Sequence, residues 1–378
     1  MIERNIKKSI VKTIVQFLNN FKDVCSIVEQ NMLYFCMLNN KNLLITGGTG
    51  SFGKAFINHI LTKYPNIKKL VIFSRDELKQ FEMSQIFNPK RIKCLRYFLG
   101  DVRDKERLNM ALNDIDVVIH AAALKQVPAG EYNPFEFIKT NVLGAQNIVE
   151  ACINNNVKKL VALSTDKATS PINLYGATKL CADKLFIAAQ NMFGIKNKLR
   201  ISVVRYGNVF ASRGSVIPYF LKQKKNGVIT ITDKEMTRFN ILLEEGVECV
   251  LWTLKNGLGG EIIIPKAPTI KIVDLAKVIG PKCKIKIIGK RVGEKIHEEL
   301  ISPYDSYNTI DLGKYYAIIP EGGLITLNNY KNKVGGKKFL NGKSYNSYDN
   351  ENYLTKNQIK KIIEKYLKSL NVSKKISL

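Results

Sequence analysis

Short apolar runs that alternate with amphipathic segments constrain the fold of this chain more than any other feature. The runs lie at residues 42–47, 69–74, 95–101, 116–123, 159–165 and 201–209, and helical patterns occupy residues 53–63, 134–155 and 175–192. Strands that are apolar along their whole length and separated by helices are typical of a parallel sheet buried on both faces. The sequence therefore predicts the α/β class, with a doubly wound parallel sheet.

The alternation ends near residue 210, where glycine and proline become frequent. We expect a Rossmann-type domain over residues 37–209, with a return segment at about 240–257, and a smaller mixed domain over residues 210–350. Residues 328–350 contain few apolar side chains and predict a long loop. Residues 351–378 predict a basic helix and tail.

The first 36 residues differ in character from the rest of the chain. An amphipathic helix is expected there, because five apolar side chains fall on one helical face: Ile10, Ile14, Phe17, Leu18 and Phe21. The segment fits an interfacial membrane helix, a partner-binding helix or an appendage without catalytic importance. Met37 could itself be the true start. No run of eighteen apolar residues occurs, so no integral membrane segment is expected.

The composition narrows the class of partner and compartment. Lys and Arg total 59 against 32 acidic residues, a formal charge of +27, which admits nucleic acid, anionic membrane or phosphorylated ligands. The excess is scattered lysine, so a basic solvated surface explains it equally well. The seven cysteines form no C-x-x-C and favour a reduced, cytoplasmic protein. With three histidines and no paired spacing, no metal site is predicted.

The first motif with chemical content is TGGTGSFG, residues 46–53, which follows an apolar run and opens a helical pattern. Gly47 permits a tight turn, Gly50 lets the backbone approach a pyrophosphate, and Gly53 allows close packing of helix on strand. The first N–H groups of the helix would then donate to the phosphates. The motif predicts dinucleotide binding by Thr46, Gly47, Gly50, Ser51, Phe52 and Gly53.

The end of the second apolar run bears on which dinucleotide is bound. NAD sites usually place an acid there for the ribose 2′-hydroxyl, whereas this chain has Ser74 and Arg75, with Lys79 one turn further. A guanidinium and a hydroxyl suit a 2′-phosphate, so NADP is favoured over NAD. The ends of the third and fourth runs are also expected beside the cofactor, at Asp101, Val102, Ala121, Ala122 and Ala123.

The fifth run leads into STDKATSPINLYGATK, residues 164–179. Tyr175 and Lys179 are one helical turn apart, and Asp166 and Lys167 precede them. A tyrosine base needs a pKa below its ordinary value of about 10. A lysine one turn away and a positive nicotinamide ring both favour the phenolate. At the end of the fifth strand of a dinucleotide-binding sheet, this group predicts catalysis rather than a solvated turn.

These features resemble the extended short-chain dehydrogenase/reductase superfamily over nearly the whole chain from residue 40. The similarity to the inverting UDP-N-acetylglucosamine 4,6-dehydratases is closer, and it rests on GGTGSFGK, FSRDELKQ, GDVRDKERL, HAAALKQVPAGEYNP, KTNVLGAQNI, STDKATSPINLYGATK, RYGNVFASRGSVIP, TDKEMTRF and GKRVGEKIHE. That family begins the synthesis of pseudaminic acid, which is used to glycosylate bacterial flagellins and other surface glycans. The resemblance implies a carbon–oxygen lyase with tightly bound NADP.

The resemblance also implies a role for each residue of the motif. In that family the sugar 4-hydroxyl is oxidised by hydride transfer to NADP, which implies that Tyr175 is the base and that Lys179 tunes it and holds the nicotinamide ribose. The position-5 proton is then removed, water leaves from position 6, and the hydride returns to position 6. Lys167 is implied for the position-5 proton and Asp166, with a raised pKa, for the departing hydroxyl.

Lys167 is the residue that points to inversion, because related dehydratases that retain configuration commonly have a glutamate at this position. A lysine base must be neutral part of the time, which requires partial burial or a neighbouring cation. A salt-bridging lysine in the turn is the alternative interpretation.

The substrate diphosphate requires cations and hydrogen-bond donors, and the resemblance places them in a sugar-nucleotide pocket. Lys125 and Asn208 are expected near the sugar, and Glu294 as an acceptor for the uridine ribose. The complete expected set is Lys125, Tyr175, Asn208, Val209, Arg213, Val216, Arg238, Arg291 and Glu294. The family commonly forms homo-oligomers through its Rossmann-domain helices.

Two alternatives stay open. Another NADP-dependent UDP-sugar dehydratase that also epimerises position 5, for a different deoxysugar, shares STDKA and SRGSV, although some of those enzymes lack the tyrosine that this chain has at Tyr175. A non-catalytic nucleotide- or nucleic-acid-binding protein would use the basic charge, but it predicts a degraded site, and the four residues of the motif are present. Nucleic acid is therefore not expected as a partner.

Overall fold

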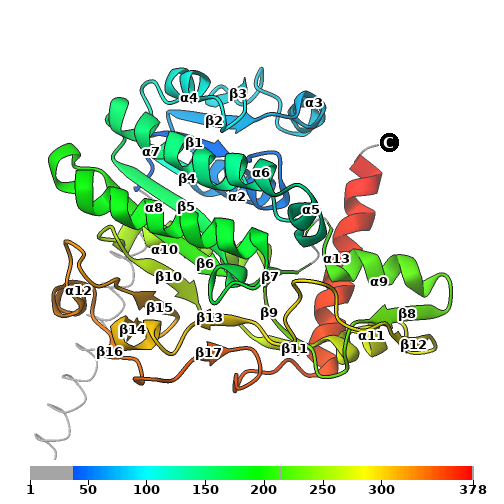
Figure 1. Ribbon diagram of the computed structural model, residues 1–378. Helices are drawn as coiled ribbons and strands as arrows, with labels where there is room; N and C mark the ends of the chain where they lie inside the picture. Colours follow the sequence, from blue (N-terminus) through cyan, green and yellow to red (C-terminus); the bar gives the residue numbers. More distant parts are fainter. Residues whose placement is uncertain (1–36, 211, 213, 377–378) are drawn as a thin grey trace, which may run out of the picture.

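The computed structural model describes residues 37–210, 212 and 214–376, and its centre is a ten-stranded sheet of order β16-β14-β15-β10-β6-β5-β4-β1-β2-β3 (Figure 1). The first six strands pair in parallel in the order expected of a doubly wound sheet, which confirms the predicted fold class. These strands are β1 Asn42–Thr46, β2 Lys69–Ser74, β3 Leu95–Leu99, β4 Val117–His120, β5 Lys159–Thr165 and β6 Arg200–Tyr206.

Helices cover both faces of the sheet, which is why the strands are apolar along their length. Figure 1 shows α7 and α8 in front of the sheet and α2 and α10 behind it. Every residue of β1 is buried, as expected for a strand between two helical layers. The helices of this part are α2 Ser51–Lys63, α3 Glu77–Ile86, α4 Lys105–Ala111, α5 Val127–Tyr132, α6 Pro134–Phe137, the π-helix η1 Ile138–Leu143, α7 Gly144–Asn154, α8 Leu174–Asn197 and α10 Leu243–Asn256.

The sheet continues past the predicted boundary at residue 210. Strand β10 pairs in parallel with β6, and β15 pairs antiparallel with β10, so parts of the predicted second domain extend the first sheet. The added strands are β10 Ile262–Pro265, β14 Thr309–Asp311, β15 Tyr315–Ile318 and β16 Lys337–Lys338. The predicted loop at 328–350 is wrong in part, because it contains β16, β17 Tyr345–Asn346 and most of α12 Leu327–Val334, which Tyr330 anchors in the core.

A smaller lobe with its own apolar core lies beside the carboxyl ends of the parallel strands (Figure 1). Phe210, Phe220 and Ile229 are buried in it together with Ile359 and Ile363 of the C-terminal helix. Its elements are β7 Asn208–Val209, α9 Val216–Lys224, β8 Val228–Ile231, β9 Thr237–Ile241, β11 Thr269–Lys271, α11 Ile272–Ile279, β12 Lys284–Ile287 and α13 Lys356–Ile376. The connection back to the sheet contains β13 Glu299–Ile301 and the 3-10 turn η3 Asp305–Asn308.

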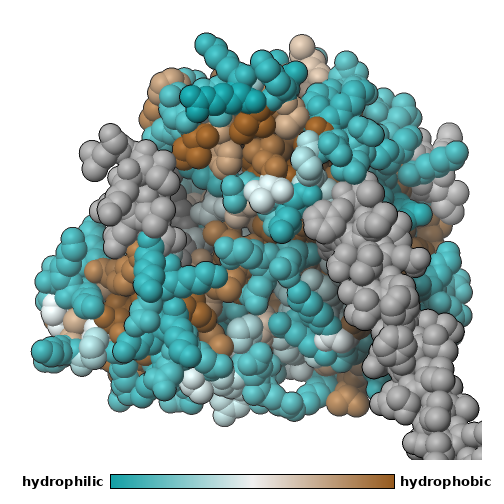
Figure 2. All heavy atoms as spheres, turned by 180° about the vertical axis from the view of Figure 1, so that it is seen from behind, coloured by the Kyte–Doolittle hydropathy of each residue, from teal (hydrophilic) through white to brown (hydrophobic). Residues whose placement is uncertain are grey.

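Hydrophilic side chains cover much of the rear face of the molecule (Figure 2). Figure 2 shows the rear face, where apolar side chains gather in separate patches among hydrophilic ones. Within the described ranges, no helix combines the length and the apolar character needed to cross a membrane. The amphipathic helix predicted for residues 1–36 lies outside the described residues.

Candidate active site

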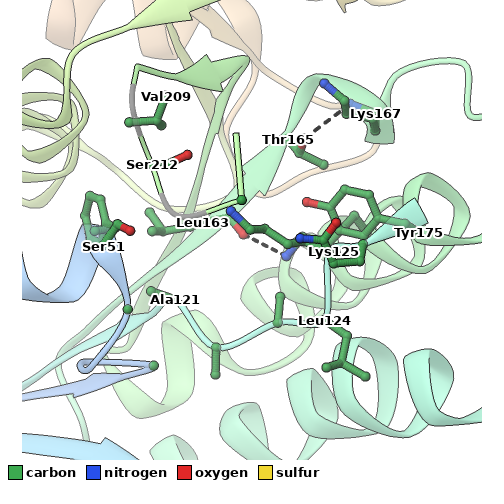
Figure 3. Close-up of a pocket in the computed structure, with 18 of the residues that line it drawn as sticks. Ser51, Ala121, Leu124, Lys125, Leu163, Thr165, Lys167, Tyr175, Val209 and Ser212 are labelled. Atoms are coloured by element: carbon green, nitrogen blue, oxygen red, sulfur yellow. Dashed lines mark hydrogen bonds between the residues drawn. The ribbon is translucent and has the colours of Figure 1, made fainter. Parts of the chain in front are cut away.

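A cavity of about 1100 Å³ is lined by the carboxyl ends of the parallel strands and by segments of the smaller lobe. Figure 3 shows Thr165, Lys167 and Tyr175 at one end of this cavity and Ser51 at the other. The cavity brings together most of the residues that were predicted to bind the cofactor and the substrate. The predicted residues that line it are Gly47, Gly50, Ser51, Phe52, Gly53, Ser74, Arg75, Lys79, Asp101, Val102, Ala121, Ala122, Ala123, Lys125, Lys167, Tyr175, Lys179, Asn208, Val209, Arg238, Arg291 and Glu294.

The glycine loop between β1 and α2 has the geometry that close approach of a ligand requires. Gly47 has a φ of +65°, and a Cβ there would lie 2.9 Å from the backbone of Ala121. A Cβ at Gly53 would lie 2.3 Å from the carbonyl oxygen of Gly48. Helix α2 therefore packs backbone against backbone on the loop, with Ser51 as its first residue. This arrangement fits a dinucleotide pyrophosphate at the start of α2.

Thr46 supports this loop from behind and does not line the cavity, which differs from its predicted role. Its hydroxyl is buried, 2.9 Å from Nδ1 of His120. The same oxygen accepts hydrogen bonds from the backbone N–H groups of Ala121 and Ala122 at 3.1 and 3.2 Å. Thr46 thereby ties β1 to the end of β4, where the small alanines face the cavity.

The ends of β2 and β3 offer both cations and carboxylates to the cavity. A nitrogen of Arg75 lies 3.6 Å from the Asp101 carboxylate, which also accepts a hydrogen bond from Arg103 at 2.8 Å. Lys79 forms an ion pair with Asp76. Burial opposes ionisation of Asp101, but the hydrogen bonds and charges of the arginines outweigh it and lower its pKa. The site fits a dinucleotide, and its preference for a 2′-phosphate stays a prediction.

Tyr175 and Lys179, in the first turns of α8, both reach the cavity. Lys179 Nζ donates a hydrogen bond to the Leu163 carbonyl at 2.7 Å, and burial lowers its pKa. Burial raises the pKa of Tyr175 to about 12, while a hydrogen bond with Thr165 and the charge of Lys167 lower it. We expected Lys179 to provide this lowering. In the structure Thr165 and Lys167 provide it instead, and burial prevails.

Lys167 is surrounded by oxygen acceptors at the cavity wall. Its Nζ lies 2.9 and 3.0 Å from the two carboxylate oxygens of Asp166, 2.9 Å from Oδ1 of Asn208 and 3.3 Å from Oε1 of Glu298. The Lys167 side chain is 20% exposed, whereas Asp166 is fully buried behind it and does not line the cavity. A proton from Asp166 can therefore reach the cavity through Lys167 or through Thr165, whose hydroxyl donates to Asp166 at 2.9 Å.

The surroundings of this cluster raise the pKa of both predicted proton carriers. Burial raises the pKa of Asp166, and the charge of Glu298 adds to this, as an acid for the departing hydroxyl requires. Burial disfavours the Lys167 ammonium, but the carboxylates of Asp166 and Glu298 outweigh it and raise its pKa. This direction is opposite to the shift that a part-time neutral Lys167 requires. Lys125 shows the opposite shift, because burial and the charge of Lys167 lower its pKa.

Gly176 fixes the distance between the two halves of the motif. A Cβ at this position would lie 2.2 Å from the carbonyl oxygen of Lys167 and 3.0 Å from Pro171. The start of α8 therefore rests directly on the 3-10 turn η2 Asp166–Ala168. This contact places Tyr175 and Lys167 in one wall of the cavity.

The smaller lobe contributes the opposite wall. The Arg238 guanidinium donates to the backbone carbonyls of the 295–296 segment at 2.8 Å and lies 3.8 Å from Glu294. Arg291 lines the cavity beside Glu294. Val216 was predicted to bind the substrate, but it packs against the apolar core of the lobe and does not line the cavity. Arg213 lies outside the described residues.

Two further residues of this site, Thr165 and Glu298, were not predicted from the sequence. Thr165 was not predicted as a site residue because it is the last residue of an apolar strand. Its hydroxyl, directly before Asp166 in the sequence, could have indicated a role in the site. Glu298 comes from a segment more than a hundred residues away, and only the fold brings it to Lys167. Within the described part of the chain, no group of three His, Cys, Asp or Glu side chains is arranged to hold a metal ion.

Comparisons with known proteins agree with this geometry. The model of the polysaccharide biosynthesis protein family matches residues 43–320. A UDP-N-acetylglucosamine 4,6-dehydratase (inverting) from Campylobacter jejuni subsp. jejuni serotype O:23/36 (strain 81-176) is 54% identical over 334 residues, which is 86% of this chain and 98% of that protein. A UDP-glucose 4-epimerase from Rickettsia akari (strain Hartford) is 45% identical over 336 residues, 86% of this chain and 96% of that protein.

A solved structure extends the similarity to three dimensions. The X-ray structure of Pen from Bacillus thuringiensis superimposes with a TM-score of 0.79 at 36% identity, and covers 87% of this chain and 99% of that one. The family model covers most of the sheet, without β16, and the residues of the smaller lobe that line the cavity. The chain therefore belongs to the polysaccharide biosynthesis protein family and is a homologue of the inverting UDP-N-acetylglucosamine 4,6-dehydratases.

Proposed function

We propose that this chain is an NADP-dependent UDP-N-acetylglucosamine 4,6-dehydratase that inverts sugar position 5. The observation that supports this most is the position of Lys167, which lines the same cavity as Tyr175 and is paired with the buried acid Asp166. Tyr175 and Lys179 suffice for oxidation and reduction at one sugar carbon. Elimination of water also needs a group that exchanges the position-5 proton and an acid for the leaving hydroxyl.

The residues of the cavity would divide the reaction as follows. Tyr175 accepts the proton of the 4-hydroxyl, and Lys179, held by the Leu163 carbonyl, positions the cofactor ribose. Bound NADP supplies the hydride acceptor and donor. Lys167 exchanges the proton at position 5. Asp166 releases a proton toward the 6-hydroxyl through Lys167 or Thr165, and water leaves.

The substrate and cofactor assignments rest on separate features. The 54% identical relative is named for UDP-N-acetylglucosamine, and Arg238, Arg291 and Glu294 offer groups for a nucleotide diphosphate. Arg75 and Lys79 are the cations that favour NADP, and the nucleotide released on denaturing the purified protein would distinguish NADP from NAD by mass. The pseudaminic acid branch and a homo-oligomer stay predictions from the family resemblance, and a cytoplasmic location stays a prediction from the cysteine pattern.

A 4-epimerase is the second candidate, because the Rickettsia akari relative has that name at 45% identity. An epimerase needs Tyr175 and Lys179 but leaves the 6-hydroxyl in place. The product therefore separates the two candidates. A 4-epimer with its 6-hydroxyl retained would favour the epimerase, and a 4-keto-6-deoxy sugar favours the dehydratase.

The test is incubation with UDP-N-acetylglucosamine in heavy water, followed by NMR of the product. We expect a 4-keto-6-deoxy sugar with deuterium and inverted configuration at position 5. Tyr175→Phe should lower the rate by about 10²- to 10⁴-fold, since it removes the base. Lys167→Ala should stop product formation while oxidation at position 4 continues. Lys184→Ala, an exposed lysine of the same helix α8 as Tyr175, is the control. A Lys167→Ala enzyme with full activity and inversion would contradict the role of Lys167.

A further inference from the structure

Glu298 stands at the centre of the charged cluster but has no assigned role. Its side chain is 4% exposed, and Oε1 lies 3.3 Å from Nζ of Lys167 and 3.7 Å from Nε of Arg238. The other oxygen, Oε2, is buried and has no hydrogen-bond partner among the residues that the structure describes. The backbone on both sides is fixed, because Glu298 N donates to the Ser347 hydroxyl and Ser347 N donates to Glu298 O.

An ammonium group has three protons to donate, and Lys167 has three neighbours to receive them. These are Asp166, Asn208 and Glu298, which come from the turn after β5, from β7 and from the segment before β13. Asp166 precedes Lys167 in the same turn, so the contact between them does not by itself fix the direction in which Nζ points. A carboxylate from a distant segment fixes Nζ against the cavity wall.

Glu298 is poorly suited to contact substrate itself. It touches the cavity but is almost wholly buried, and Lys167 is the more exposed of the two. Arg238 does not need Glu298 for its own placement, since three backbone carbonyls accept its N–H groups. The contact of Glu298 that bears on the reaction is therefore the one with Lys167.

We propose that Glu298 is a positioning residue, which holds Nζ of Lys167 at the cavity wall and sets the pH at which that nitrogen gives up its proton. This inference rests on the proposed function, because it assumes that Lys167 exchanges the position-5 proton. The charge of Glu298 is one of the causes that raise the pKa of Lys167, and it also raises that of Asp166. The other charged or titratable groups that act on this cluster are Arg238, Lys295, Lys125 and Tyr175.

The test compares Glu298→Gln with Glu299→Gln in the full-length protein. The glutamine keeps the size of the side chain and removes its charge. Glu299 is the matched control, because it is the next residue and its carboxylate accepts from Ser170 instead of Lys167. We expect kcat of Glu298→Gln to fall about 10- to 100-fold through misplacement of Nζ, with KM changed less than about twofold, since Glu298 lies behind the residue that faces the substrate.

The pH profile separates positioning from a merely structural role. Loss of a carboxylate within about 4 Å lowers the pKa of a cation by about 1–3 units, so the limb of the kcat profile that belongs to Lys167 should move to lower pH by that amount. Glu298→Asp keeps the charge and should keep the wild-type limb with a reduced kcat. If Glu298→Gln does not fold, the test rests on the pH profile of Glu298→Asp. A shift of its Lys167 limb away from the wild-type position would overturn the proposal.

The outcomes also distinguish this inference from the proposed function. A wild-type protein that binds NADP but does not convert UDP-N-acetylglucosamine would refute the proposed function. An active wild type, with a folded Glu298→Gln variant whose kcat and pH limbs match it, would refute the role of Glu298 alone. A lower melting temperature with unchanged limbs would show a structural role and would equally overturn the proposal.

Discussion

Replacement of Thr165 by valine removes a hydroxyl that contacts both Tyr175 and Asp166. Valine keeps the shape of the side chain and removes the hydrogen bond to Tyr175 and the one donated to Asp166 Oδ1 at 2.9 Å. The hydrogen bond with Thr165 lowers the pKa of Tyr175, which burial raises to about 12. Its removal should therefore raise that pKa further and reduce the fraction of phenolate at any working pH.

The magnitude follows from the number of protons that Thr165 has. Its single hydroxyl proton must be shared between Asp166 and the phenolate, so the net value of about 0.5–1.5 kcal/mol for one hydrogen bond applies. At about 1.36 kcal/mol per pH unit, this is a rise of about 0.4–1.1 units in the pKa of Tyr175. Well below the pKa, the phenolate fraction falls in proportion, so oxidation at position 4 should slow by about 2- to 13-fold.

The assay is a single turnover with UDP-N-acetylglucosamine, in which the absorbance of the reduced cofactor reports oxidation at position 4 as a function of pH. The ascending limb of Thr165→Val should lie at higher pH than that of the wild type. Thr165→Ser keeps the hydroxyl and should follow the wild type. Equal oxidation rates for Thr165→Val and the wild type at every pH would refute the argument that this hydroxyl sets the proton affinity of Tyr175.

Two further predictions concern stability. Gly53→Ala would place a Cβ 2.3 Å from the Gly48 carbonyl oxygen, so we expect a loss of about 1–3 kcal/mol in thermal or denaturant melts together with weaker NADP binding. Gly246→Ala, a helical glycine whose Cβ would find its nearest atom at 3.5 Å, is the control and should not destabilise; equal losses in both variants would contradict the packing argument. Burial raises the pKa of Glu261 from near 4.5 to about 7, so the native state holds a proton that the unfolded chain releases, and stability should fall as pH rises between these values. Glu261→Gln should flatten that slope in denaturant melts, and an unchanged slope would show that another group is responsible.

Much of the fold could be predicted from the sequence, because strands buried on both faces must be apolar along their length. Leu43, Leu44 and Ile45 are fully buried, and the run that contains them marked β1 correctly. The extension of the sheet by β14, β15 and β16 was missed. These strands are short. Although β14 and β15 are adjacent in sequence and pair with each other, β15 joins the sheet at β10, and an excursion through the smaller lobe separates those two strands. No local periodicity reveals that pairing.

The site shows the same division between local and distant contacts. Residues 164–179 lie in one stretch of chain, so their spacing alone indicated that Tyr175 and Lys167 lie close together. The raised pKa of Lys167 could not be predicted in full, because Glu298 from another segment adds to the effect of the neighbouring Asp166. Thr46 and Val216 were placed in the site by their motifs, yet one supports the loop and the other packs in the lobe core. A motif therefore indicates a neighbourhood, and packing decides which of its side chains face the ligand.

The contact of Gly176 with the Lys167 carbonyl limits how this enzyme could be redesigned. Since two backbones touch there, repacking of side chains does not change the separation of the two backbone segments that hold Tyr175 and Lys167. A bulkier or differently shaped sugar could not be accommodated by an adjustment of that wall. New specificity would be sought first at the exposed Arg291 of the facing segment. Gly293 and Lys295 of that segment are tied to the motif through Asn173 and the Thr169 carbonyl. The wall that contains Tyr175 and Lys167 is thus fixed by a backbone contact, and the exposed Arg291 is the part of the facing wall that is open to change.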